Sequence, residues 1–239
     1  FAMHYQPLVD AESGSLLGAE ALIRWDRGDR QTSFPDDFIP FAERTYLIHE
    51  IGDWVFKSVF SQVQRWCAAG HSLRTWLNVS AAQLDSRLPA KLEALISQYR
   101  MDVNCIGLEL TETAFIGRDD EVLRILRDVK ALGVRLALDD FGVKYSSLDH
   151  LQRLPIDVLK IDRIFVSGVN TNSVNRAIIR AIIAVARELN FEVSAEGVET
   201  REEMEMLRTL GCDTLQGYYF SGAVPPQEIA KYMLQGRTA

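Results

Sequence analysis

The chain has 239 residues, 47% of them hydrophobic, which is enough to bury one sizeable core as a single α/β barrel or as two small domains. It carries 26 basic and 33 acidic residues for a formal net charge of −7, and the lack of any basic run argues against a nonspecific duplex-binding protein. Three cysteines at unrelated spacings argue against a disulfide framework or a CxxC metal site and favour a reducing, cytoplasmic setting.

Strand patterns alternate with helical patterns along the chain. Short apolar or β-branched runs occur at residues 1–10, 22–25, 75–80, 106–112, 134–140, 158–162 and 191–197. Longer stretches of helical period separate these runs, which predicts βαβ units and a mainly parallel sheet. No Pro-rich or Gly/Ser-rich linker divides the chain, so we expect a single domain over residues 1–239. Because ordered-looking sequence begins at the first residue without an initiator methionine, we expect this domain to be part of a longer protein.

One helix can be predicted from its angular spacing of about 100° per residue. Over residues 173–189, one face carries Ile178, Ile182 and Val185. Another face carries Arg176, Arg180 and Arg187, which predicts an outer helix with one side in water. Residues 177–186 are the most apolar stretch of the chain, but they are about half a membrane span long and contain Arg180. We therefore expect no transmembrane segment and no signal peptide.

Polar side chains lie at or near the end of five of the predicted strands. They are Asn78, Glu109, the pair Asp139 and Asp140, Lys160 and Glu196. In a (β/α)₈ barrel all the carboxyl ends of the strands meet at one mouth, so these residues would be neighbours in space. A site rich in oxygen and without clustered histidines or cysteines suits hard cations such as Mg²⁺ or Mn²⁺. Any one of these acids could instead cap a helix or face solvent, but that alternative explains the whole set poorly.

Asp139 and Asp140 raise a question of geometry, because successive residues of a strand point to opposite faces. Both can serve one site only if the backbone turns there, and Gly142 permits such a turn. Adjacent carboxylates repel each other unless a cation lies between them. Two divalent cations about 4 Å apart would keep the pair ionised and form a centre able to cleave a phosphodiester.

Nine segments resemble, in the same order, the motifs of the EAL family of bacterial cyclic di-GMP phosphodiesterases. They are YQPLVD (5–10), EALIRW (20–25), FIPFAE (38–43), LNVS (77–80), ELTET (109–113), DDFG with YSSL (139–148), LPIDVLKID (154–162), AEGVET (195–200) and QGYYF (216–220). The resemblance implies a single TIM-like (β/α)₈ barrel of the EAL type with one antiparallel strand. It also implies metal-dependent hydrolysis of cyclic di-GMP to linear 5′-pGpG, with two divalent cations, Mg²⁺ or Mn²⁺.

The same resemblance assigns roles to residues of this chain. The implied metal ligands are Glu20, Asn78, Glu109, Asp139, Asp140 and Glu196. Lys160 matches the lysine that holds the attacking water, Glu196 matches the general base, and with Glu20 they form the implied catalytic set. The implied substrate-binding residues are Gln6, Leu22, Arg24, Glu199 and Gln216, with Arg24 on a phosphate. Leu22 could instead be a core residue, and Gln6 could pair with a strand edge.

Three segments depart from the family pattern. After the paired aspartates, Val143 and Lys144 replace the usual threonine and glycine of a loop that Glu112 is expected to steady. We expect this change to soften or reshape the loop and to weaken metal or substrate affinity. Tyr46 replaces a usual glycine, and SGAVPP at 221–226 replaces a typical arginine-proline pair; both are interpreted as surface or partner variation.

The resemblance also frames the expected partners. We expect a homodimer, upstream sensory or cyclase-like domains, no nucleic-acid polymer and no membrane contact by this domain, although the full-length protein could be tethered to the inner membrane. A second function remains open: the chain could bind cyclic di-GMP and report its concentration without cleaving it. Such receptors typically lose ligands such as Glu20 or one of the aspartates, and this chain keeps them.

Overall fold

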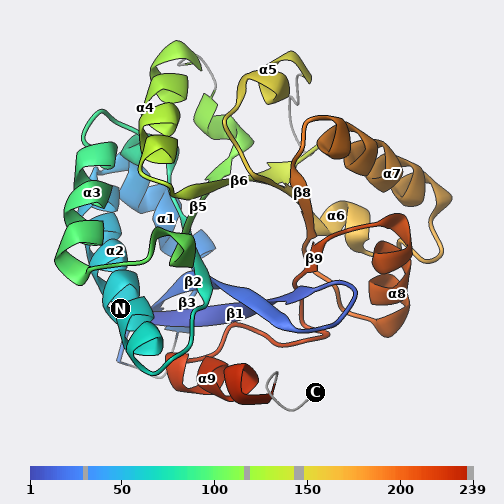
Figure 1. Cartoon of the computed structure of the whole chain (residues 1–239), viewed down its shortest axis with the longest axis horizontal. Helices are drawn as coiled ribbons and strands as arrows, with labels where there is room; N and C mark the ends of the chain where they lie inside the picture. The colour runs from blue at the N-terminus through green and yellow to red at the C-terminus, as the bar shows by residue number, and fades with distance from the viewer. Residues whose placement is uncertain (29–31, 116–118, 143–147, 236–239) are drawn as a thin grey trace.

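The computed structural model describes residues 1–28, 32–115, 119–142 and 148–235. Within these ranges, eight strands close into a barrel and a short ninth strand, β3 (Thr32–Ser33), pairs with the end of one of them (Figure 1). In the order in which they pair around the barrel, the eight are β1 (Ala2–Asp10), β2 (Leu16–Asp26), β4 (Arg74–Asn78), β5 (Ile106–Thr111), β6 (Arg135–Phe141), β7 (Val158–Ile161), β8 (Glu192–Ala195) and β9 (Thr214–Leu215).

Strand β1 runs antiparallel to both of its neighbours, β2 and β9, and the other barrel strands pair in parallel. A tight hairpin explains this exception, because antiparallel strands need only a short connection. In the hairpin, Asp10 Oδ1 accepts the backbone N–H of Ser13 at 2.7 Å, and Gly14 has a φ of 70°. The predicted TIM-like barrel with one antiparallel strand is confirmed.

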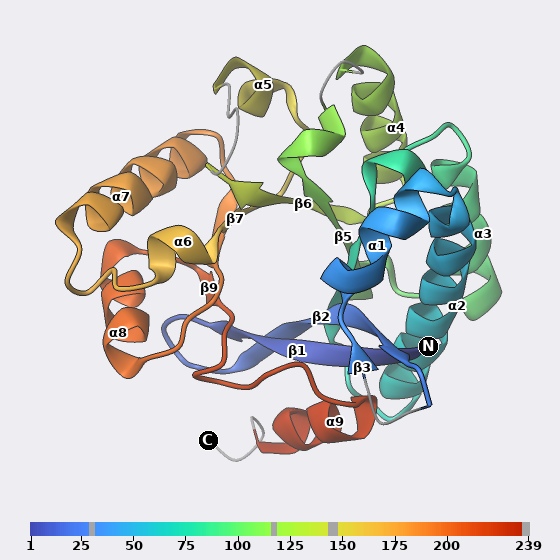
Figure 2. The ribbon, with the colours of Figure 1, turned by 180° about the vertical axis from the view of Figure 1, so that it is seen from behind.

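Helices surround the barrel on its outer side (Figures 1 and 2). They are α1 (Pro35–Arg44), α2 (Leu47–Ala68), α3 (Leu88–Tyr99), α4 (Asp119–Ala131), α5 (Leu148–Arg153), α6 (Arg163–Val166), α7 (Ser173–Glu188), α8 (Arg201–Leu210) and α9 (Pro226–Gln235). Short 3₁₀ turns occur at η1 (Ala81–Gln83), η2 (Val103–Cys105) and η3 (Glu112–Phe115). Helix α9 lies against β1, on the antiparallel side of the barrel. None of the described helices is long and apolar enough to cross a membrane.

The helix predicted over residues 173–189 is α7. Asn172 caps its first turn through hydrogen bonds from the N–H groups of Val174 and Asn175. Its buried stripe consists of Ile179, Ile182, Ile183 and Ala186. Ile178 and Val185, which were predicted to lie on the buried face, flank this stripe and are only partly buried. The buried face is therefore shifted by about one residue from the predicted face.

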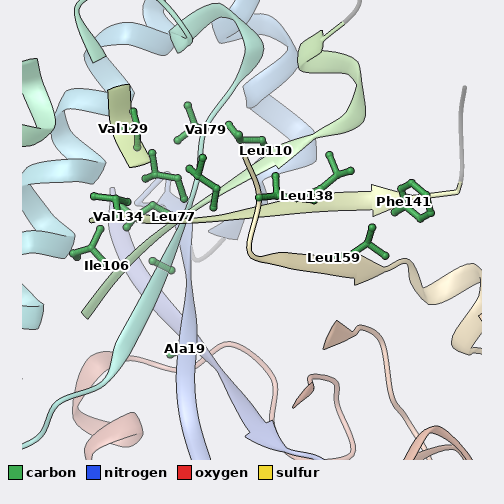
Figure 3. Close-up of a cluster of buried hydrophobic side chains, with 14 of the residues drawn as sticks. Ala19, Leu77, Val79, Ile106, Leu110, Val129, Val134, Leu138, Phe141 and Leu159 are labelled. Atoms are coloured by element: carbon green, nitrogen blue, oxygen red, sulfur yellow. The ribbon is translucent and has the colours of Figure 1, made fainter. Parts of the chain in front are cut away.

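The core has two parts. The larger part fills the space between strands and helices, as Figure 3 shows for Leu77, Leu110 and Leu138. The smaller part lies inside the barrel and consists of Leu8, Trp76, Ala137 and Val158. Gly107 makes room for the Trp76 ring, because a Cβ at position 107 would lie 2.3 Å from Trp76 Cε3.

The inner cluster determines where the polar residues lie. Since side chains alternate along a strand, the next residue to point inward lies two positions further on. Two positions beyond Trp76, Gly107, Ala137 and Val158 lie Asn78, Glu109, Asp139 and Lys160. The packed interior therefore gives way, within one step along each strand, to a layer of polar side chains at the carboxyl end of the barrel.

Candidate active site

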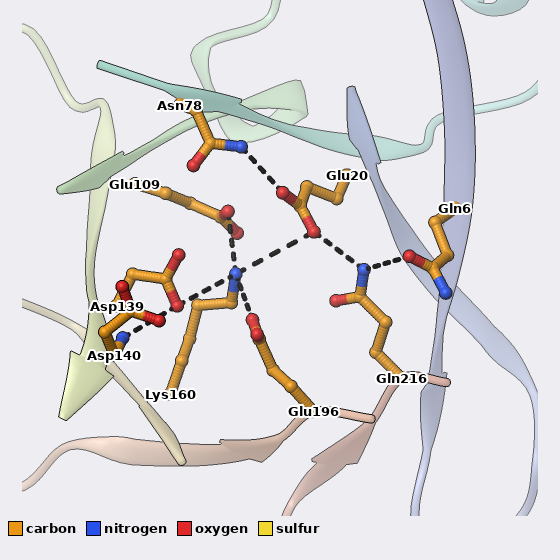
Figure 4. A network of polar contacts seen from close by, with 9 residues as sticks. All are labelled: Gln6, Glu20, Asn78, Glu109, Asp139, Asp140, Lys160, Glu196 and Gln216. Atoms are coloured by element: carbon orange, nitrogen blue, oxygen red, sulfur yellow. Dashed lines mark hydrogen bonds and ion pairs between the residues drawn. The ribbon is translucent and has the colours of Figure 1, made fainter. Parts of the chain in front are cut away.

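Lys160 lies at the centre of this polar layer (Figure 4). Its Nζ is 2.7 Å from Glu109 Oε2, 3.5 Å from Asp139 Oδ1 and 3.9 Å from Glu20 Oε2, and it also contacts Glu196 Oε1. The side chains of Lys160 and Glu109 are each only 1% exposed. Glu109, Asp139 and Glu196, which the pattern of strand ends placed near Lys160, thus meet at its ammonium group. Glu20 of β2, assigned to the site by the resemblance, joins them.

A chain of amides continues the network toward β1. Glu20 Oε1 accepts from Asn78 Nδ2 at 2.6 Å, and Glu20 Oε2 accepts from Gln216 Nε2 at 2.7 Å. Gln216 also donates to Gln6 Oε1 at 3.1 Å, and Gln6 donates to the carbonyl of Ser221 at 3.1 Å. The network therefore extends from Lys160 on β7 to Gln6 on β1. Ser221, in a segment interpreted from sequence as surface variation, accepts the hydrogen bond that holds Gln6.

The backbone turns at the paired aspartates. Asp140 has a φ of 56° and Gly142 a φ of 91°, and the pairing of β6 with β7 shifts register between Leu138 and Phe141. The turn therefore begins at Asp140 itself, one of the residue types that tolerate this conformation, and Gly142 is a second left-handed position. Figure 4 shows Asp139 and Asp140 together at the mouth of the barrel. The predicted loop at Val143 and Lys144 lies outside the described residues.

The electrostatics of the site are dominated by excess negative charge. Burial raises the pKa of Glu109 well above its ordinary value, and nearby carboxylates add to the effect of burial while Lys160 opposes it. Burial and the neighbouring Asp139 also raise the pKa of Glu196 well above the ordinary value and that of Asp140 to about 6. Burial alone would lower the pKa of Lys160, but the surrounding carboxylates outweigh it and raise this pKa well above the ordinary value.

The donor set fits hard divalent cations. Five carboxyl groups and one amide can supply oxygen ligands. Within the described ranges, Glu109 Oε1 and Gln216 Oε1 are buried and have no hydrogen-bond partner. Among the described residues, no three acidic, histidine or cysteine side chains are arranged as ligands around one point. Figure 4 shows the carboxylates of Glu20, Glu109, Asp139 and Glu196 turned toward Lys160 Nζ. Rotation of these side chains away from the ammonium group would make their oxygens available to a cation.

The remaining predicted residues do not contact Lys160 in the described part of the chain. Leu22 and Arg24 line a cavity of about 810 Å³ beside Glu20 and Asn78, and Leu22 is only partly buried. Glu199 is exposed, and its backbone N–H donates to Glu203 Oε2 at 3.0 Å. Glu112 begins η3, and its Oε2 is buried and has no hydrogen-bond partner among the described residues. The loop that Glu112 was expected to steady lies outside them.

Sequence reasoning missed Glu203, which is 6% exposed. Its Oε1 accepts the N–H of Gly168 at 2.8 Å, and its Oε2 accepts the N–H groups of Glu199 and Thr200. It thereby fixes the segment that follows Glu196. The signal was present in the sequence, because Thr200 followed three residues later by glutamate is a capping box.

A closed β/α barrel with polar side chains gathered at the carboxyl ends of its strands defines the class of barrel proteins whose functional site lies at that end. Comparison with known proteins narrows this class. The sequence model of the EAL domain family matches residues 1–223, and the chain belongs to this family.

Several relatives cover nearly the whole chain. The bifunctional diguanylate cyclase/cyclic di-GMP phosphodiesterase MucR of Pseudomonas aeruginosa is 38% identical over 95% of this chain and 33% of its own length. The cyclic di-GMP phosphodiesterase PdeR of Escherichia coli is also 38% identical, over 93% of this chain and 34% of its own length. The chain thus spans about a third of the curated relatives it matches.

Solved structures agree with the fold. The structure described as the PaMucR phosphodiesterase in complex with c-di-GMP superposes with a TM-score of 0.91 at 38% identity, covering 95% of this chain and 93% of that one. The EAL domain of Mycobacterium smegmatis DcpA gives a TM-score of 0.85 at 29% identity, covering 100% of this chain and 98% of that one.

Proposed function

We propose that this chain is a phosphodiesterase domain that hydrolyses cyclic di-GMP to linear 5′-pGpG with two divalent cations, Mg²⁺ or Mn²⁺. The observation that carries the proposal is the convergence of Glu20, Glu109, Asp139 and Glu196 on Lys160 at the mouth of an EAL barrel. The names of relatives at 38% identity support the same substrate. Glu20, Asn78, Glu109, Asp139, Asp140 and Glu196 would hold the cations.

The charge of the site explains why cations are needed. A cyclic dinucleotide carries two phosphodiester anions, and both the chain, with a net charge of −7, and the carboxylates at the barrel mouth repel it. When bound, divalent cations supply the positive field that attracts the phosphates and lower the pKa of a coordinated water toward neutrality. Arg24, on the wall of the cavity, adds a fixed positive charge for one phosphate.

The chain's own residues then have distinct tasks. Lys160 holds and orients the attacking water. Glu196, which contacts Lys160, accepts a proton from that water. The water oxygen forms a bond to phosphorus while the bond to the 3′ oxygen breaks. The 3′ oxygen takes up a proton from solvent and becomes a hydroxyl, so the ring opens and a 5′ phosphate remains. Leu22 lines the cavity, and Gln6 and Gln216 are hydrogen-bonded to each other; with Glu199, these residues are assigned to nucleotide binding.

The other expectations remain part of this proposal. We place the domain in the cytoplasm, as a homodimer attached to upstream sensory or cyclase-like domains. The Val143 and Lys144 substitutions are proposed to lower metal or substrate affinity. The second function, a cyclic di-GMP receptor without turnover, is less well supported because every implied ligand is present.

The test is the rate at which cyclic di-GMP disappears in the presence of Mn²⁺. Glu20→Ala should abolish turnover, because it removes a carboxylate that Asn78, Gln216 and Lys160 all contact. Arg87→Ala, which breaks an exposed ion pair with Asp85, is the control and should retain the parent rate. Turnover by Glu20→Ala at the parent rate would show that the site assignment is wrong.

A further inference from the structure

Phe34, at the edge of the cavity, is an unusual residue for its position in the helix. It is the N-cap residue of α1, a position that favours Ser, Thr, Asp or Asn because their side chains accept a backbone N–H. A phenyl ring cannot accept in this way. The residue is also 55% exposed and lines the cavity beside Arg24. Such departures from local preference are expected at functional sites.

The backbone holds Phe34 firmly in this place. Its N–H donates to Asp37 Oδ2 at 2.8 Å, and Pro35 begins the helix immediately after it. The ring is therefore presented from a constrained position at the start of α1, and little conformational freedom of the backbone would be lost on binding.

The ring also contacts the proposed phosphate-binding arginine. Arg24 Cζ lies 5.0 Å from the centroid of the Phe34 ring, within the range of a cation–π interaction. Arg24 donates to the carbonyl of Ile23 at 2.9 Å, so the guanidinium is held from two sides. Since more than half of Phe34 remains exposed despite this contact, the ring offers further surface to the cavity.

We propose that Phe34 is a substrate-contacting residue that holds Arg24 at the cavity wall and stacks against a guanine base of the bound dinucleotide. This inference rests on the proposed function. The physical basis is that every nucleobase has a π-face that stacks on aromatic rings, and that a phosphate bound by Arg24 would bring its base within reach of the neighbouring ring. Phe34 would thus contribute to substrate affinity without taking part in bond cleavage.

The test measures kcat and KM with Mn²⁺, together with the Kd of a hydrolysis-resistant phosphorothioate analogue of cyclic di-GMP by calorimetry. Phe34→Ser and Phe34→Leu should raise KM and Kd about tenfold, from the loss of one stacked base, and change kcat less than about twofold. Phe34→Tyr, which keeps the ring, should stay within about twofold of the parent chain. The matched control is Phe41→Ser, because Phe41 is 56% exposed on the same helix and is not among the described residues that line the cavity.

A structural role is separated from a binding role by thermal unfolding. Serine is a good N-cap, so Phe34→Ser should raise the unfolding midpoint by about 2 °C while weakening binding. Parent-like KM and Kd in Phe34→Ser and Phe34→Leu would overturn this inference and leave the proposed function intact. If the parent chain neither binds the analogue nor cleaves cyclic di-GMP, the proposed function fails and the role of Phe34 fails with it.

Discussion

Lys160 is a fully buried cation whose charge is balanced by carboxylates from four other segments of the chain. Removing one partner of a buried ion pair leaves uncompensated charge in a poorly solvated place. In the absence of divalent cations, Lys160 is therefore a structural residue as well as a proposed catalytic one, because it holds the acidic side chains together.

Replacing Lys160 by methionine tests this balance. With metal chelated, Lys160→Met should lower the free energy of unfolding by about 3–5 kcal/mol, and Mn²⁺ should then raise the unfolding midpoint more in the variant than in the parent. Thermal and denaturant unfolding with and without Mn²⁺ provide the measurement. Lys130→Met is the control, because Lys130 pairs with Asp157 in a partly exposed position, and its replacement should lower the free energy of unfolding by about 1 kcal/mol. Equal losses of unfolding free energy in Lys160→Met and Lys130→Met would refute this structural role of Lys160.

The sequence predicted that Asn78, Glu109, Asp139, Lys160 and Glu196 come together, because the carboxyl ends of barrel strands meet at one mouth. Glu20 and Gln216 were assigned to the site only by the resemblance. The sequence did not predict their partners. The hydrogen bond from Gln216 to Glu20 joins residues 196 positions apart, and the left-handed conformation of Asp140 depends on the local register shift between β6 and β7. Both depend on how closed strands are staggered, which no local pattern encodes.

Among the elements, α2 begins at an unfavourable residue. Tyr46, the N-cap of α2, has a φ of 60° and is 77% exposed. A residue other than glycine is strained in this left-handed backbone conformation. The sequence interpretation of Tyr46 as surface variation explains its exposure but not its backbone conformation.

Tyr46→Gly should raise the free energy of unfolding by about 0.5–1 kcal/mol, since glycine adopts a positive φ readily. Tyr46→Ala removes the same ring but keeps a Cβ, so it should give no gain. Chemical denaturation of the three proteins is the measurement. A gain in Tyr46→Ala as large as that in Tyr46→Gly would show that the exposed ring, and not the backbone, is the source of the effect.

Helix α8 is joined to the segment after Glu196 through Glu203. Burial acts to raise the pKa of Glu203, but hydrogen bonds from the N–H groups of Gly168, Glu199 and Thr200 outweigh it and lower this pKa. A lowered folded-state pKa means that the carboxylate stabilises the protein above the pKa of an unfolded glutamate, about 4.3. This stabilisation is lost as the pH falls through the lower, folded-state value.

Glu203→Gln should therefore lower the free energy of unfolding at pH 7 by about 1–2 kcal/mol, because a charged acceptor is replaced by a neutral one. The difference from the parent should shrink as the pH falls below about 4, where the parent carboxyl also becomes neutral. Denaturant unfolding across this pH range measures both. Glu205→Gln, on the exposed face of α8, should leave stability unchanged at each pH. A pH-independent loss in Glu203→Gln would contradict the assigned role of the charge.

At the scale of the whole molecule, the alternation of strand and helical patterns predicted βαβ units and a mainly parallel sheet. The resemblance to the EAL family predicted that this sheet closes into a barrel. The position of α9 against β1 was not predicted, since it depends on a contact between the two ends of the chain. The contact between Cys67 and Cys105, with sulfur atoms 3.8 Å apart, was also not predicted, because the two residues are 38 positions apart in the sequence. The nine ordered motifs carried the family assignment, and the geometry of the barrel mouth carries the proposed chemistry.

The central claim is that this barrel cleaves cyclic di-GMP and does not merely bind it. The most direct measurement is chromatography of cyclic di-GMP incubated with the parent chain and saturating Mn²⁺. The account predicts conversion to a single product that co-elutes with 5′-pGpG, with no conversion when the metal is chelated or when Glu20 is replaced by alanine. Recovery of intact cyclic di-GMP from the parent chain, with the nucleotide demonstrably bound, would contradict the account and identify the protein as a receptor.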